Sequence, residues 1–429
     1  MPVAEDHHAS GGLPTSPRPL FLKPAYKYRL PLEVWELIID YHSDDVRTLL
    51  ACSLTCSALL RRSRRHLYRR VVLRTEDRAA YFVRALTHDP GNWGAVHALE
   101  VEGELFSTEG TSMPLLFPML RTLHTLVVHK LRQAAYDGAR ACLAAVQHSV
   151  TTLSLSGAYL RSLPALAALL TRLPHLRHLA LLDVVFEEPV DEARIDEAAA
   201  PVLALDTFDF RGWAHRAGGA HIRSVLAWVC AASPGTLRSL RLQVPLGGHT
   251  SGAVHRIVAA HSATLHTLVL DLGARGFEDF EFRFGENTAL RRLQLCLPAT
   301  TPTTCAQLLR GLPGGGRALA DLALVFRALN DSYSPAATPF ARIAALRPLF
   351  AEGAFAALER LHIRCALEAT PLFVTPPREA LYRDLVFQDW LPEAPRDAWT
   401  DDLEETFDRV FEIWSMLRYS FGDEAPYFD

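Results

Sequence analysis

One short pattern in this sequence, a pair of cysteines, combines residue types that could bind a metal. Cys52 and Cys56 stand four residues apart, a spacing that would place two thiolates on one face of a helix. No second cysteine pair or nearby histidine completes the four ligands that a structural zinc site needs. The seven cysteines are scattered through apolar surroundings, which is typical of reduced thiols that serve as small core residues. The sequence therefore predicts no metal site.

Two glycine-containing motifs resemble catalytic loops only in part. The sequence GHTSG at 248–252 is close to the nucleophile motif GxSxG, but its serine lies one position late. The sequence GLPGGGR at 311–317 lacks the lysine and the serine or threonine that bind phosphate and magnesium, so it is typical of a turn. No HExxH motif and no dinucleotide fingerprint occurs. We predict that the protein is not an enzyme and uses no cofactor.

The arginine-rich run RRSRRHLYRR at 61–70 could bind phosphate groups. The net charge of the chain is −4, however, and a run at the end of a predicted helix is usually a solvated face, so we expect no nucleic-acid partner. Apolar stretches are interrupted by charges before they reach the ~20 residues that a membrane span requires. Residues 1–27 contain no apolar signal segment. These features predict a cytoplasmic or nuclear protein without a membrane partner.

The segment 30–73 is predicted to begin with a helix that carries more apolar surface than it can bury. Pro31 suits the first turn of a helix, where its fixed φ is favourable and its missing N–H costs nothing. A unit of roughly 45 residues is too small to cover a helix that is apolar on nearly every side. The surplus surface predicts a partner protein. The apolar residues of this helix are Leu32, Val34, Trp35, Leu37, Ile38, Ile39 and Tyr41.

After this segment the phrase LxxLxL recurs about every 29 residues, which indicates a structural repeat. Its alternation of apolar and variable positions is typical of a half-buried strand. We therefore expect one strand at each middle anchor. These anchors are Leu99, Leu126, Leu153, Leu179, Phe208, Leu240, Leu268, Leu293, Leu322, Leu361 and Leu385.

Helical patterns lie between the predicted strands. Apolar residues recur at helical spacing in 222–229 and again in 254–258. Thr301 and Pro302 are typical of a helix start, and the glycines of 311–316 of its end. Each repeat is therefore predicted to contain one strand and one helix, and the fold class is α/β.

The repeats resemble those of a leucine-rich repeat solenoid over about residues 90–390. The resemblance implies a curved parallel sheet with helices on its convex side. The fifth position after each middle anchor holds residues such as Glu104, Leu131 and Ala158 in place of the usual asparagine or cysteine. Packing or backbone hydrogen bonds must therefore hold the turns.

The segment before the repeats resembles an F-box, in the form joined to degenerate leucine-rich repeats in basidiomycete fungal proteins. The resemblance lies in LPLEVWELIID, DDVRTLLACSLTC and RRSRRHLYRRV. It implies a three-helix unit that binds the Skp-family adaptor of a cullin-type (SCF) ubiquitin ligase. The implied adaptor contacts are Leu30, Pro31, Val34 and Ile38, supported by Leu49 and Leu50.

Four regions follow from these interpretations. We predict a disordered N-terminal segment over 1–27, an N-terminal three-helix F-box over 28–72 and a degenerate leucine-rich repeat solenoid over 73–396. A helix that caps the last repeat, followed by a tail, is predicted over 397–429.

The predicted function is that of a substrate receptor, in which the solenoid binds an unknown target protein. Side chains that alternate with the anchors form the candidate target-binding face: Glu100, Glu102, His129, Asp209, Arg211, Arg241, Asp271, Arg292, Arg360, His362 and Arg364. The alternative is an interaction scaffold outside the ligase, whose F-box-like unit is only a solenoid cap. His42 and Leu59 favour it, because F-boxes usually have a leucine and an aromatic residue there. Adaptor binding requires Val34 and Ile38 to be exposed in the isolated protein.

Overall fold

The computed structural model describes residues 30–107, 112–188, 202–212, 219–243, 248–271, 284, 287–298, 302–312, 318–329, 346, 355 and 357–368. The chain forms two compact units, Met1–Leu67 and Tyr68–Asp429. The predicted disordered segment 1–27 and capping helix 397–429 lie outside the described residues.

The described part of the first unit consists of α1 (Leu32–Tyr41), α2 (Val46–Thr55) and α3 (Ser57–Leu67). As predicted, α1 begins directly after Pro31, whose carbonyl oxygen accepts hydrogen bonds from the N–H groups of Val34 and Trp35. Asp45 caps α2, because its carboxylate accepts hydrogen bonds from the N–H groups of Arg47 and Thr48. Its core is small.

That core contains three fully enclosed apolar side chains, one from each helix: Ile39, Leu49 and Leu59. Cys52 and Leu67 pack against them and remain half-buried. Leu59 is thus a core residue of this unit.

The described residues of the second unit form an eleven-stranded sheet in which every neighbouring pair is parallel. The strands follow one another across the sheet in chain order, which confirms the predicted α/β class. They are β1 (Arg70–Leu73), β2 (Ala98–Glu102), β3 (Thr125–His129), β4 (Thr152–Ser156), β6 (His178–Leu182), β8 (Thr207–Arg211), β9 (Ser239–Gln243), β10 (Thr267–Asp271), β11 (Arg292–Pro298), β12 (Asp321–Leu329) and β13 (Arg360–Glu368).

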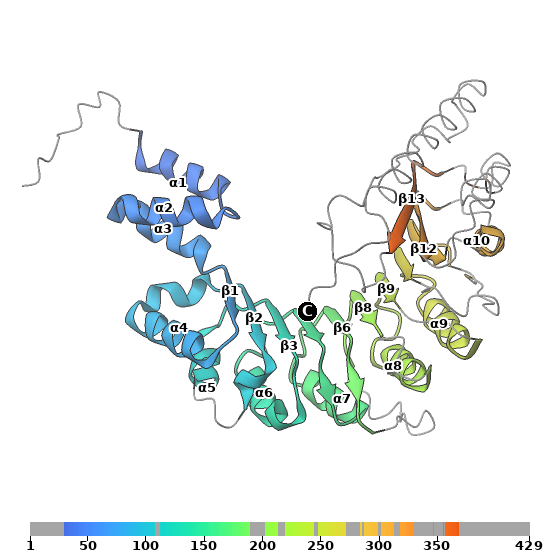
Figure 1. The fold of residues 1–429 in the computed structure, drawn as a ribbon, viewed down its shortest axis with the longest axis horizontal. Helices are drawn as coiled ribbons and strands as arrows, with labels where there is room; N and C mark the ends of the chain where they lie inside the picture. Colours follow the sequence, from blue (N-terminus) through green and yellow to red (C-terminus); the bar gives the residue numbers. More distant parts are fainter. Residues whose placement is uncertain are drawn as a thin grey trace, which may run out of the picture. The chain divides into compact units, whose positions relative to one another are not determined.

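Helices cover one face of this sheet (Figure 1). The helices formed by the described residues are α4 (Glu76–His88), α5 (Ser112–Leu116), α6 (Gln133–Ala145), α7 (Leu163–Leu170), α8 (Gly219–Ala232), α9 (Gly248–Ala260) and α10 (Pro302–Arg310), with short 3-10 turns η1 (Pro90–Ala95), η2 (Gly103–Phe106) and η3 (Phe117–Met119). The helices predicted in 222–229, in 254–258 and from Pro302 are confirmed as α8, α9 and α10.

The predicted anchors set the register of the sheet. Leu99 pairs with Leu126, which pairs with Leu153, and the same in-register pairing continues through the anchors to Leu361. These anchors are buried and form one continuous core with the helices. The anchor predicted at Leu385 lies outside the described residues. One more strand, β1, precedes the first anchor and pairs Val71 with Leu99, so residues 68–72 belong to the second unit.

Backbone hydrogen bonds hold the turns after the strands, as the missing asparagines predicted. Lys130, Gly157 and Asp183 each follow a strand with φ between 52° and 61°, and each N–H donates to the last carbonyl of the next strand at 2.7–2.8 Å. The next residue is buried in each case, for example Leu131 and Ala158. A small sheet of β5 (Tyr159–Leu160) and β7 (Val185–Phe186) follows these turns. Packing and backbone bonds thus replace the side-chain ladder.

Candidate functional site

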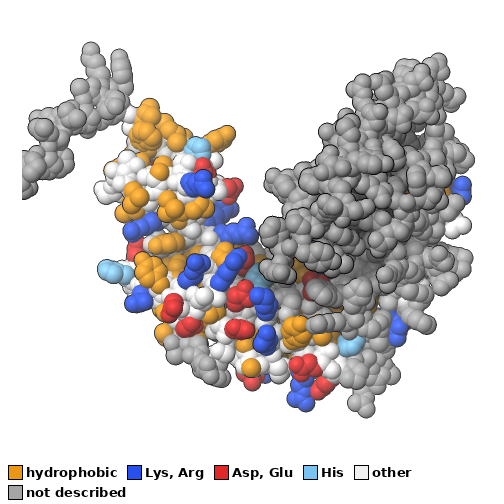
Figure 2. Space-filling model, viewed as in Figure 1, with side chains coloured by type: hydrophobic (Ala, Val, Ile, Leu, Met, Phe, Trp, Pro, Cys, Tyr) orange, Lys and Arg blue, Asp and Glu red, His pale blue; other side chains and the backbone are white. Residues whose placement is uncertain are grey.

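The first unit exposes apolar side chains over α1 and α2, and we name this set the α1–α2 apolar surface. Of the fourteen large apolar side chains exposed among the described residues, nine lie in the 25 positions from 30 to 54. Figure 2 shows hydrophobic side chains gathered over these helices. Exposed apolar side chains gathered in this way usually mark a surface that binds another macromolecule. The nine residues are Leu30, Leu32, Trp35, Leu37, Ile38, Tyr41, Val46, Leu50 and Leu54.

The predicted adaptor contacts fall mostly on this surface. Leu30, Pro31, Ile38 and Leu50 are exposed, Ile38 to 37% and Leu50 to 48%. Val34 is half-buried, so the exposure that adaptor binding requires is met by Ile38 but only in part by Val34. Leu49 is only 1% exposed and packs in the three-residue core, so its inclusion as a contact is wrong. One helical step of about 100° separates Leu49 from Leu50, which turns one inward and the other outward.

The sequence interpretation missed most of the exposed residues on α2. Val46, Leu50 and Leu54 are four residues apart and therefore form one stripe along the helix. That spacing was a usable signal, because Leu49 and Cys52 already supply a separate inward face. On α1, Leu37 and Tyr41 are 68% and 86% exposed. They extend the surface beyond the contacts that the F-box resemblance implied.

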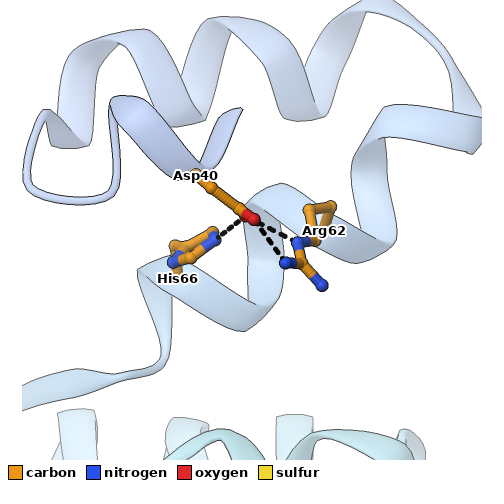
Figure 3. Close-up of polar contacts among 3 residues, drawn as sticks. All are labelled: Asp40, Arg62 and His66. Atoms are coloured by element: carbon orange, nitrogen blue, oxygen red, sulfur yellow. Dashed lines mark hydrogen bonds and ion pairs between the residues drawn. The ribbon is translucent and has the colours of Figure 1, made fainter. Parts of the chain in front are cut away.

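A charged cluster joins the end of α1 to α3 (Figure 3). The Asp40 carboxylate accepts two hydrogen bonds from the Arg62 guanidinium, the one from Nε at 2.6 Å, and its Oδ1 lies 2.7 Å from Nε2 of His66. Hydrogen bonding by Arg62 lowers the pKa of Asp40 to about 2, with a further contribution from His66 and an opposing one from burial. Two members of the 61–70 run thus serve the fold of the unit, while Arg61, Arg64 and Arg65 are exposed.

Replacing Asp40 with asparagine should weaken the first unit by about 1–2 kcal/mol at pH 7, a value reduced for the partial exposure of the pair. The wild type should lose the same increment in acid. A carboxylate whose folded pKa is lowered stabilises fully above its unfolded pKa of 3.8, and this contribution disappears as pH falls towards about 2. Thermal unfolding of the first unit, monitored through the hydrogen exchange of residues 32–67 at pH 7 and at pH 2, measures both effects. Equal losses in the control Asp44→Asn, which changes an exposed carboxylate outside the cluster, would contradict the role assigned to Asp40.

A second candidate site lies in the second unit, on the face of the sheet opposite the described helices (Figure 1). A hollow of about 440 Å³ is lined by Arg74, Glu100, Glu102, His129, Lys130 and Asp183, among others. Glu100 lies 3.1 Å from Nε2 of His129 and 3.7 Å from Arg70, and Glu102 lies 3.6 Å from Lys130. Three predicted target-binding residues therefore meet in one hollow, and both glutamates already lie close to a basic side chain.

The other predicted target-binding residues occupy the later strands and do not reach this hollow. Asp209 lies 3.9 Å from Arg241, and burial raises the pKa of the Asp209 carboxyl despite the opposing charge of its arginine neighbours. Arg292 and Arg360 both pair with Asp321, at 3.0 Å and 2.7 Å. Arg211 is exposed and His362 is half-buried.

Two predicted target-binding residues need separate mention. Asp271 is only 6% exposed, so its assignment to the accessible face is wrong. Asp271 is the last residue of β10, and the alternation of apolar and variable residues could not show that its side chain is covered. Arg364 lies in β13, and its side chain falls outside the described part. Lys130 and Asp183 were missed, although both occupy the position that follows a strand and line the hollow.

The patterns that could have supported chemistry have structural places. The GHTSG sequence forms the first five residues of α9, so Ser251 lies within the helix. Cys52 packs against the core of the first unit and Cys56 is exposed at the end of α2. Within the described residues, no group of three or more His, Cys, Asp or Glu side chains is placed to hold a metal ion. The same part of the chain forms no helix of the length and apolarity that crossing a membrane requires.

Comparison with protein-family models found no match to this chain, and comparison with curated proteins found no relative.

Proposed function

We propose that the protein is a substrate receptor of a cullin-type ubiquitin ligase, acting in the cytoplasm or the nucleus. In this proposal the first unit is an F-box that binds a Skp-family adaptor through the α1–α2 apolar surface. The second unit is a leucine-rich repeat solenoid that binds a target protein. The receptor brings the target to the ligase and carries no catalytic residue of its own.

The observation that carries this proposal is the unequal distribution of exposed apolar side chains. Nine are found in 25 residues of the first unit, whereas the much longer described part of the second unit has five. Full burial of an exposed side chain of this size is worth about 1.5–3 kcal/mol, and these nine, which are 37–86% exposed, retain a corresponding part of that value. A partner that covers several of them therefore gains binding energy. Because Ile38 is exposed, it is available to a partner in the isolated chain.

The arrangement of the helices supports the same role. Ile39, Leu49 and Leu59 hold the three helices together, and the Asp40–Arg62–His66 cluster fixes the end of α1 to α3. Both devices keep the outward residues of α1 and α2 in place before binding, which lowers the entropy cost of association. The in-register anchors of the second unit support the solenoid assignment.

Adaptor binding tests this proposal. Purified full-length protein should bind a purified Skp-family adaptor, and the double variant Ile38→Asp/Leu50→Asp should bind at least 100-fold more weakly, because each change places a charge in a desolvated apolar contact. The matched control Tyr81→Asp/Leu115→Asp introduces the same two charges at side chains of α4 and α5 that are 71% and 58% exposed, and it should bind as the wild type does. Surface plasmon resonance gives the affinities, and circular dichroism verifies folding.

Two results would contradict the proposal. Unchanged binding by the double variant would show that the adaptor does not use this surface. Absence of binding by the wild type would favour the alternative, an interaction scaffold in which the first unit serves only as a cap for the repeats.

A further inference from the structure

The strands of the second unit all begin at one edge of the sheet, and we name this the amino-terminal edge. It comprises the first residue of each sheet strand and the residue before it. The first residues pair in register from Arg70 to Arg360. The carbonyl of each preceding residue, from Arg69 to Ala320, accepts hydrogen bonds from two successive N–H groups of the next strand. Neighbouring positions along the edge are therefore about 4.8 Å apart.

This edge is rich in basic residues. Its 22 positions hold seven arginines, four histidines and three acidic residues. Two of the acids are neutralised within the edge: Asp206 lies 3.2 Å from Arg177, and Asp321 binds two arginines. The basic residues are Arg69, Arg70, His97, His124, Arg177, His178, Arg238, His266, Arg291, Arg292 and Arg360.

Several of these arginines form no polar side-chain contact within the described fold. Arg69, Arg238 and Arg291 are exposed and form no ion pair or side-chain hydrogen bond with another described residue. Basic residues often stabilise the last turn of a helix, but the last turns of α6 and α7 contain none, and the arginines of the edge come after the helices. Like charges held along one edge repel each other, so folding alone does not favour them.

The excess of positive charge is not repeated at the opposite edge of the sheet. There, the last residues of the short strands and the residues that follow include three acidic residues, Glu102, Asp183 and Asp271, and three basic ones, Arg74, Lys130 and Arg211. The whole chain has a net charge of −4. An asymmetry of this kind attracts and orients an anionic partner.

We propose that the amino-terminal edge binds an acidic segment of a partner protein in extended conformation. Arg177, Arg238 and Arg291 precede β6, β9 and β11, which are two strands apart in the sheet, so their backbone positions repeat about every 10 Å. An extended polyproline II chain places every third side chain on one side at a repeat of about 9.3 Å. Acidic residues at every third position match this spacing.

A polypeptide fits this edge better than a nucleic acid does. Apart from histidine, none of the 22 positions has an aromatic side chain on which a base could stack. The edge lies within the second unit, so this inference does not depend on adaptor binding. If the proposed function holds, the acidic segment belongs to the target.

Fluorescence anisotropy with the full-length protein tests the inference. The probe is a fluorescein-labelled peptide of six Glu-Pro-Pro repeats at 50 mM salt, compared with the matching Lys-Pro-Pro peptide and an 18-nucleotide oligo(dT). The acidic peptide should bind, and binding should weaken as salt increases. The variant Arg238→Glu/Arg291→Glu should lose at least tenfold in affinity. The matched control Arg78→Glu/Arg140→Glu changes exposed arginines of α4 and α6 and should change affinity less than twofold.

Each other outcome overturns the inference. Tighter binding of oligo(dT) than of the acidic peptide would identify a nucleic-acid surface. Equal weakening in both double variants would show that only overall charge matters. No binding of the acidic peptide at 50 mM salt would mean that the edge is not an interface. Circular dichroism of the variants separates these results from misfolding.

Discussion

Replacing Gly138 with alanine should destabilise the second unit by about 2–3 kcal/mol or more, although alanine is the better helix former. Gly138 lies in α6, where it packs against η2. A Cβ atom at this position would lie far inside contact distance of the carbonyl oxygen of Phe106, and a backbone atom cannot move aside cheaply. We expect α6 to shift away from η2, with a fall in the thermal unfolding midpoint of the sheet unit measured by calorimetry.

A second helical glycine provides the matched control. Gly252 lies in α9 with open space around its Cα, so the same substitution there should stabilise by up to about 1 kcal/mol through helix propensity alone. The two glycine-to-alanine changes thus have opposite predicted signs. A neutral or stabilising Gly138→Ala would show that α6 does not approach η2 as closely as the structure places it.

Replacing Leu49 with alanine should unfold the first unit while the second stays folded. Deleting a fully buried leucine side chain costs about 2–5 kcal/mol, and a three-helix unit with only three enclosed apolar side chains has little stability to lose. The large core of the second unit contains none of these residues. Hydrogen exchange should show loss of protection over residues 32–67 and unchanged protection over the strands of the sheet.

The matched control for this change is Leu54→Ala, at a leucine that is 86% exposed in the same helix. It should leave protection of α1–α3 unchanged. If the proposed function is correct, Leu49→Ala abolishes adaptor binding through unfolding, whereas Leu54→Ala weakens it through lost contact only. Equal protection in the two variants would contradict the core assignment of Leu49.

The sequence was most informative where one simple physical rule repeats. A strand with one buried face must place an apolar residue at every second position, so the LxxLxL phrase located Leu99 and its equivalents and predicted their register up to Leu361. The backbone-held turns followed from the absence of asparagine. Pro31 located the start of α1 because its missing N–H is tolerated only there.

Contacts between distant residues were beyond this kind of reasoning. The sequence offers no sign that Asp40 meets Arg62 and His66, because their pairing depends on how α1 crosses α3. The pairing of Glu100 with His129 likewise joins residues on adjacent strands, and alternation shows only that both leave the core. Leu49 and Leu50 differ in exposure because of helix rotation, which the four-residue spacing of Val46, Leu50 and Leu54 could have indicated.

The chain-order sheet has a thermodynamic consequence. Each interior strand touches only the strands before and after it, so the stability of the second unit is a sum of nearest-neighbour terms. A strand in the middle opens only by breaking two such interfaces, whereas β1 at one end breaks a single one. Unfolding should therefore begin at a terminal strand and proceed strand by strand towards the middle of the sheet. A mechanical force applied to one end of the sheet should detach the strands in chain order.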